Sequence, residues 1–169
     1  VSRRLRYCGY VCPSPASPSD AEKLRNRYLR DASAGDLIVA MAGGGADADG
    51  LFTTLLSAAP AISARRPCVV VIVTGPFLPR SEHRKLVRLA RGLPVHVIRS
   101  VHDSLTYLGA ADLVIAMAGY NTTAEILTLD KPALLVPRSG PSAEQRMRAE
   151  LFADRGPNVV DLVLRGHDL

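Results

Sequence analysis

The sequence has 169 residues, of which 47% are hydrophobic and 5% aromatic, and its formal net charge is +5. This length suits one domain with a full hydrophobic core and excludes two large domains. Residues 1–30 hold seven Arg or Lys against two acids, whereas the two signs balance in the rest of the chain. A nucleic-acid-binding domain usually spreads a basic stripe over its fold, so this distribution argues against nucleic acid as a partner.

The cysteines and the hydropathy pattern favour a cytoplasmic protein. Cys8, Cys12 and Cys68 give an odd count without the spacing of metal ligands, which predicts free thiols and no metal site. No apolar run reaches the length of a membrane span. Four cations of the segment 80–91 leave peripheral contact with an anionic membrane open, beside the alternative of a solvated helix face: Arg84, Lys85, Arg88 and Arg91.

The first 19 residues are expected to be a lead-in to the domain. "LRYCGYV" (5–11) can form a short strand, and the prolines of "CPSPASPS" indicate an extended linker. Ser19 and Glu22 have the spacing of a capping box, which predicts a helix over 20–31. The domain proper is therefore expected to span residues 20–169.

Beyond this helix, apolar segments and helical segments alternate regularly. Strands are predicted over 36–42, 68–75, 95–100, 112–118 and 132–137, with 158–160 as a candidate sixth. Helices are predicted over 51–63, 80–91, 103–110, 121–129 and 142–155. Strands that are apolar on both faces and separated by helices indicate a parallel sheet covered on both sides. The expected fold is α/β, with a doubly wound parallel sheet of about six strands.

A glycine-rich loop follows the first of these strands. Gly43, Gly44 and Gly45 expose backbone N–H groups, and the following helix aims the positive end of its dipole at the same place. The loop is therefore compatible with phosphate. Asp47 and Asp49 would repel a phosphate if they faced it, and a tight turn without a ligand is the alternative.

The same loop loosely matches the GxGxxA pattern of a nicotinamide dinucleotide site through Gly43, Gly45 and Ala48. Such a site needs an acid about 20 residues further on to hold the ribose. After Asp49 the next acid is Glu82, so this match is weak.

The segment "MAGYNTTAEIL" (117–127) places polar residues at the end of a buried strand. Gly119 permits a sharp turn, and Asn121 or Thr122 can cap the next helix. Glu125 shares a helix face with Thr122, and its carboxylate can accept hydrogen bonds from both hydroxyls of a ribose. The alternative is a Thr122–Glu125 capping box that needs no ligand.

A third polar segment, "PRSGPSAEQRMRAE" (137–150), follows the fifth strand. Ser142 and Gln145 again have capping-box spacing. Glu144 and Gln145 are expected near the rim of the same crevice, within reach of sugar hydroxyls. A plain capped surface helix is the alternative.

Taken together, these segments resemble the MurG-like glycosyltransferases of the family 28 type. The resemblance is strongest from "SLTYLGAADLVIAMAGYNTTAEILTLDKPALLVPR" through "EQRMRAELFADRG". It implies the Rossmann-like C-terminal half of a GT-B fold, which binds a nucleotide-sugar donor. The resemblance implies that Glu125 binds the ribose and that the diphosphate lies at Gly119, Thr122 and the three loop glycines. It also implies that Glu144 and Gln145 contact the sugar, and that the nucleobase lies against the backbone at Ile98, Arg99 and Ser100.

The resemblance implies an inverting enzyme that moves a sugar from a nucleoside diphosphate, most simply UDP, to an acceptor hydroxyl, with the nucleotide-sugar as substrate and no cofactor. It identifies no catalytic residue, because in the family the base comes from an acceptor-binding N-terminal half. "RYCGYVCP" is similar to the crossover between the halves, so that half is expected outside this chain. Alternatives are a non-catalytic donor-binding subunit acting with a partner chain, a nicotinamide dinucleotide domain, and a GT-B sugar epimerase.

Overall fold

The computed structural model describes residues 6, 8–12, 14–30, 35–138, 140, 143–153 and 159–161. Strands and helices alternate along these residues, as the sequence predicts. The strands are β1 (Asp36–Met41), β2 (Cys68–Val73), β3 (Val95–Ile98), β4 (Leu113–Ala116), β5 (Ala133–Leu135) and β6 (Val159–Asp161). The helices are α1 (Pro18–Leu29), α2 (Asp49–Arg65), α3 (Arg80–Leu89), α4 (Ser104–Ala110), α5 (Tyr120–Thr128) and α6 (Glu144–Ala153).

The strands form one parallel sheet in the order β3-β2-β1-β4-β5-β6. The chain moves outward from β1 through β2 to β3, and then crosses back to place β4 on the other side of β1. Met41 pairs with Val73 on one side and with Ala116 on the other, so these three strands end level with one another. The loops after β1 and β4 therefore meet at the point where the strand order reverses.

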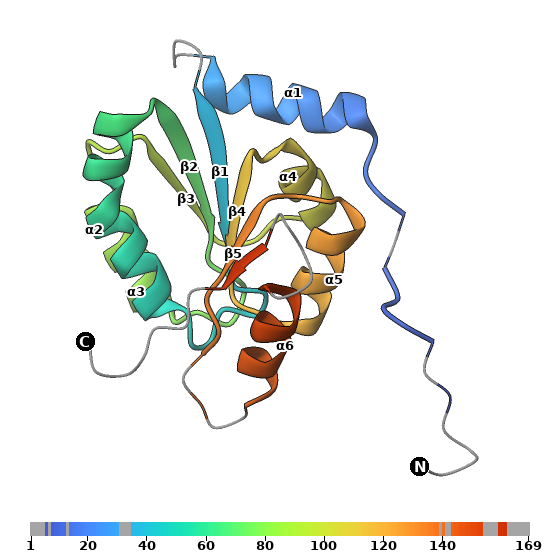
Figure 1. Ribbon diagram of the computed structural model, residues 1–169. Helices are drawn as coiled ribbons and strands as arrows, with labels where there is room; N and C mark the ends of the chain where they lie inside the picture. Colours follow the sequence, from blue (N-terminus) through green and yellow to red (C-terminus); the bar gives the residue numbers. More distant parts are fainter. Residues whose placement is uncertain are drawn as a thin grey trace.

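Helices cover both faces of the sheet, because its central strands are apolar on both sides. In β1, Leu37 and Val39 lie in one apolar cluster, and Ile38 and Ala40 lie in the other. The first cluster packs under α1, α4, α5 and α6, and the second packs under α2 and α3 (Figure 1). The doubly wound α/β fold expected from the sequence is confirmed.

The start of α1 differs from the prediction. The helix begins at Pro18, after Ser17, without a side-chain capping bond, so Ser19 lies inside the helix and the Ser19–Glu22 capping box is wrong. Proline suits the first helical position because its fixed φ is already helical and it has no N–H to satisfy there.

The lead-in segment runs alongside the body of the domain. The strand expected over 5–11 does not form at its described residues, 6 and 8–11. The Tyr10 ring instead stacks on Tyr120 of α5 at 4.8 Å between centroids, and the Val11 N–H donates to the Tyr120 hydroxyl. Among the described residues, none of the helices combines the length and the apolar character that a membrane span requires.

Candidate functional site

Two adjoining cavities open at the carboxyl end of the sheet, where β1 and β4 finish. The first has a volume of about 350 Å³ and the second about 240 Å³. Gly43, Asn121 and Thr122 line both, so the cavities form one continuous cleft. The first cavity extends toward Asp47, Arg138 and Gln145, and the second toward Ser100, Ser104 and Glu125. The cleft therefore lies at the switch point, where open parallel sheets bind ligands.

The three consecutive glycines of the β1–α2 loop do not have the same role. Gly45 has φ +84°, and a Cβ there would overlap the carbonyl oxygen of Thr74, at the end of β2. Its N–H donates to the Ala42 carbonyl at 3.1 Å. In contrast, the N–H groups of Gly43 and Gly44 have no hydrogen-bond partner in the described part of the chain. Gly45 therefore fixes the loop against β2, and the other two leave donors at the cleft.

The helix after the glycine loop presents an uncapped start. Ala48 precedes α2 and supplies no side-chain cap. Asp49, in the first turn, pairs with Lys85 of α3 at 3.3 Å and is not part of the cavity wall. Asp47 does line the first cavity, where it pairs with Arg138 at 3.2 Å. Of the two acids that the sequence places near a phosphate-compatible turn, only Asp47 faces the cleft.

The start of α5 corrects the prediction that Asn121 or Thr122 caps this helix. The N-cap is Gly119, whose carbonyl accepts from the Thr123 N–H at 3.0 Å, and no side chain caps the end. Asn121 and Thr122 therefore lie in the first turn, and their N–H groups have no acceptor within the helix. The Thr122–Glu125 capping box does not form. The uncapped start of α5 thus lines the cleft beside the glycine loop that leads into α2, whereas the first residues of α2 line neither cavity.

Glu125 lies one turn into α5, in the wall of the second cavity. One carboxylate oxygen accepts from the Ser104 hydroxyl at 3.1 Å. Burial raises the pKa of Glu125 above its ordinary value, the Ser104 hydrogen bond opposes this shift, and the negative charge of Asp103 adds to it. A half-buried carboxylate without a cation among these contacts is poised to accept hydrogen bonds from a ligand.

This burial predicts a pH-dependent cost in stability. With its pKa raised, folded Glu125 binds more protons than the unfolded chain, so its contribution to stability falls as pH rises from about 4.5 through the raised pKa. We expect Glu125→Gln to raise the free energy of unfolding at pH 7, and the gain to shrink below pH 4.5. Urea unfolding at pH 7 and below pH 4.5 measures this gain in the free energy of unfolding. Glu150→Gln, at an exposed position of α6, is the control, and an equal gain there would contradict the cause.

The structure brings most of the predicted site residues into the cleft, with three exceptions. Ser100 lines the second cavity, but Ile98 and Arg99 do not, and their carbonyls accept from the Thr74 and Gly75 N–H groups. The Arg99 guanidinium instead donates to the Pro76 and Leu78 carbonyls, which fixes the β2–α3 loop.

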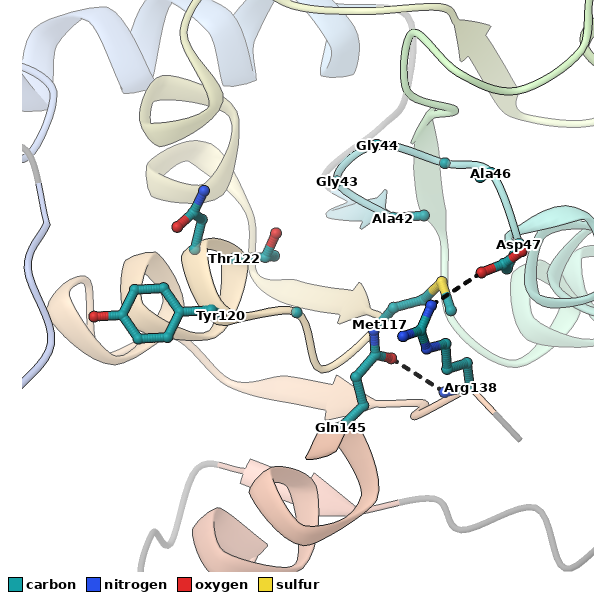
Figure 2. Close-up of a pocket in the computed structure, with 13 residues that line it drawn as sticks. Ala42, Gly43, Gly44, Ala46, Asp47, Met117, Tyr120, Thr122, Arg138 and Gln145 are labelled. Atoms are coloured by element: carbon teal, nitrogen blue, oxygen red, sulfur yellow. Dashed lines mark hydrogen bonds and ion pairs between the residues drawn. The ribbon is translucent and has the colours of Figure 1, made fainter. Parts of the chain in front are cut away.

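On the side of α6, only Gln145 of the two expected residues lies in the cleft. It lines the first cavity and accepts from the Arg138 N–H at 3.1 Å (Figure 2). Glu144 is exposed, pairs with Arg148, and is not part of either cavity wall. Ser142 lies outside the described residues, so its capping role stays a prediction.

Sequence reasoning missed two prominent residues of the first cavity, Tyr120 and Arg138. Arg138 had a usable signal, because a cation that directly follows the apolar run "PALLVP" must lie at the carboxyl end of a strand. Among the described residues, no group of three or more His, Cys, Asp or Glu is arranged to hold a metal ion.

The arrangement of the sheet and its cleft is the Rossmann-like architecture of GT-B glycosyltransferases. The crystal structure of Acinetobacter baumannii MurG superposes with a TM-score of 0.60 and 22% identity, covering 90% of this chain and 42% of that one. Residues 38–162 match the model of the glycosyltransferase family 28 C-terminal domain. The chain belongs to this family, as the sequence resemblance predicted.

Curated relatives agree with this assignment. The chain is 30% identical over 131 residues to a UDP-N-acetylglucosamine–N-acetylmuramyl-(pentapeptide) pyrophosphoryl-undecaprenol N-acetylglucosamine transferase of Acidothermus cellulolyticus, covering 76% of this chain and 35% of that protein. It is 29% identical over 119 residues to an uncharacterized glycosyltransferase of Methanosarcina mazei, covering 70% of this chain and 29% of that protein. The chain thus spans about a third of the length of these relatives.

Proposed function

We propose that this domain binds the nucleoside-diphosphate sugar of an inverting glycosyltransferase, with UDP as the nucleotide. The observation that carries the proposal is the position of Glu125 beside the glycine loop and the open start of α5. Glu125 lines the second cavity, which shares Gly43, Asn121 and Thr122 with the first cavity. A ribose diol at Glu125 and a diphosphate between the glycine loop and the start of α5 would then fit one continuous ligand.

The diphosphate would be held mainly by backbone groups. The N–H groups of Gly43 and Gly44 and those of the first turn of α5 converge on the first cavity. Helix N-termini favour anions through their dipoles and open N–H groups. The same donors would stabilise the negative charge that develops on the departing diphosphate during sugar transfer, and each positioned donor of this kind contributes about 3–4 kcal/mol in studied enzymes.

The end of β2 disfavours the nicotinamide alternative. A dinucleotide site of that type needs an acid there to hold the ribose. This chain has Thr74 and Gly75, and Thr74 is fully buried. A Cβ at Gly75 would lie 2.5 Å from the Gly43 carbonyl oxygen, which excludes a side chain at that position without a shift of the loop.

The choice of UDP rests on the family and on the relative in Acidothermus cellulolyticus, whose name specifies a UDP-sugar donor. The acceptor hydroxyl would attack the anomeric carbon on the face opposite the diphosphate, which gives inversion. We assign no residue of this domain as the general base. An acceptor-binding domain, or a partner chain that supplies one, would complete the reaction.

Calorimetric titration with UDP tests the proposal. We expect wild type to bind UDP, and Glu125→Gln to lose about 1–3 kcal/mol of binding free energy, because a hydrogen-bonded charge is removed from the ribose hydroxyls. Uridine, which lacks phosphate, should lose the same amount of binding free energy in the Glu125→Gln variant.

Glu150→Gln, at an exposed position, is the matched control and should bind as wild type does. NAD is the competing ligand in a parallel titration. Binding of NAD without binding of UDP, or unchanged UDP affinity in a folded Glu125→Gln variant, would refute the proposed donor site.

A further inference from the structure

An ion pair between Asp47 and Arg138 crosses the first cavity. Asp47 lies on the loop after β1, and Arg138 lies just beyond β5, so the pair joins loops from opposite sides of β4. The Arg138 Nη1 atom donates to Asp47 Oδ2 at 3.2 Å. Figure 2 shows the Arg138 side chain extended past Met117 toward the opposite loop. The pair occupies the cavity that the glycine loop and the open start of α5 line.

Arg138 is held in place but incompletely satisfied. Its own N–H donates to Gln145 Oε1 at 3.1 Å, which fixes the backbone below the side chain. Its Nε atom is buried, without a hydrogen-bond partner in the described part of the chain. A guanidinium has five N–H donors in a fixed fork, and a buried donor that is left unpaired is unfavourable because it has lost its hydrogen bonds to water. A ligand with several acceptor oxygens would accept hydrogen bonds from the guanidinium donors that Asp47 leaves unpaired.

The two partners differ in how freely they can separate. The Asp47 side chain is 60% exposed, whereas that of Arg138 is only 33% exposed. Asp47 can therefore turn into water at little cost, because ion pairs with an exposed partner contribute little to stability. Arg138, which is largely enclosed by the cavity wall, would stay where it is.

We propose that Arg138 is the side-chain ligand of the donor's diphosphate, and that its counter-ion Asp47 competes with the phosphate for it. This inference rests on the proposed function. A guanidinium binds phosphate oxygens through two parallel hydrogen bonds, more strongly than a neutral donor does. It would complete a cradle whose other donors are the backbone N–H groups of Gly43, Gly44 and the first turn of α5. Asp47, freed from the pair, would turn toward solvent.

The alternative is a tether that only holds two loops together. The two interpretations predict opposite effects of Asp47→Asn on the affinity for UDP. If the pair is a tether, removing either partner loosens the loops, and both variants bind UDP more weakly. If Arg138 binds the diphosphate, then Asp47→Asn removes a competitor and strengthens binding, whereas Arg138→Gln weakens it.

The experiment is a UDP titration of the full chain carrying each substitution. We expect Arg138→Gln to bind UDP about 10- to 100-fold more weakly, as for the loss of a hydrogen bond to a charged group. Asp47→Asn should bind about 2- to 5-fold more tightly, in line with an exposed ion pair. Arg138→Lys keeps the charge without the forked donors, and its affinity for UDP should lie between those of Arg138→Gln and wild type. Uridine should bind wild type and Arg138→Gln equally, because it carries no phosphate.

Arg66→Gln is the matched control. Arg66 pairs with Asp36 at the opposite end of β1, with Nη2 3.0 Å from Oδ1, far along the strand from the cleft. Its loss should leave UDP affinity unchanged, and thermal unfolding of each variant identifies any that fails to fold, in which case Arg138→Lys carries the test.

Weaker UDP binding in both Asp47→Asn and Arg138→Gln, or unchanged UDP binding in folded Arg138→Gln, would overturn the inference. If UDP binds wild type and Glu125→Gln weakens uridine binding while Arg138→Gln has no effect, only this inference fails. If wild type binds neither UDP nor uridine, the proposed donor site fails and this inference with it.

Discussion

Replacing Gly45 with Ala is expected to lower the free energy of unfolding by about 2–6 kcal/mol, because left-handed backbone strain adds to the cost of overpacking. Gly45 has φ +84°, and an added Cβ would overlap the Thr74 carbonyl oxygen while lying 3.0 Å from its carbon. Both obstacles are backbone, so no side-chain rotation relieves them. The loop must move away from β2, which would also displace the open N–H groups of Gly43 and Gly44. Urea unfolding followed by circular dichroism measures the loss, and UDP titration measures the effect on the site.

Gly50→Ala is the matched control five residues further along the chain. Gly50 lies in the first turn of α2, and a Cβ there meets nothing within 4 Å. The same chemical change should therefore stabilise the protein by about 0.5–1 kcal/mol, because alanine loses less conformational entropy in a helix. Equal effects of the two substitutions would show that the contact with Thr74 does not constrain the loop.

Phe52→Ala is expected to destabilise the domain by about 3–5 kcal/mol, the range for truncating a buried aromatic side chain. Phe52 is fully buried in the apolar cluster between α2 and the sheet. It lies one turn after the start of α2, so it also anchors the helix that follows the glycine loop. A loss of this size is a large part of the stability of a typical domain.

Phe77→Ala provides the contrast for Phe52. The Phe77 side chain is 73% exposed, on the loop that follows β2, so its removal should change stability by less than about 0.5 kcal/mol. Thermal or urea unfolding of both variants compares the two. A loss at Phe77 that matches the loss at Phe52 would contradict the assignment of the core to this face of the sheet.

Much of the candidate site could be predicted because parallel strands bring their carboxyl ends to one edge. Gly43, Thr122, Glu125 and Gln145 each follow or flank such an end, and all lie in the cleft. Arg99 also follows a strand, but the structure uses its side chain to hold neighbouring carbonyls. Position along the chain therefore indicates which residues reach the edge, but not which contacts they make there.

Helix starts show the same limit of prediction from sequence. The spacing of Thr122 and Glu125 is that of a capping box, and only the structure shows that the helix begins earlier, at Tyr120 after Gly119. Capping is decided by which carbonyl first enters the helical hydrogen-bond pattern, and several adjacent residues in this segment could have done so. A capping motif read from sequence thus cannot tell a closed helix end from one that is open to a ligand.

By itself, the sequence determined the order of strands and helices, the burial of both sheet faces and the family, because these follow from hydrophobic periodicity and local motifs. Only the tertiary structure decided which acid faces the cleft and which glycine is held against Thr74. It also decided that Asp47 pairs with Arg138 across the first cavity. Those two residues are 91 positions apart. Contacts of that kind depend on how loops from separate strands converge, and no local pattern in the chain encodes them.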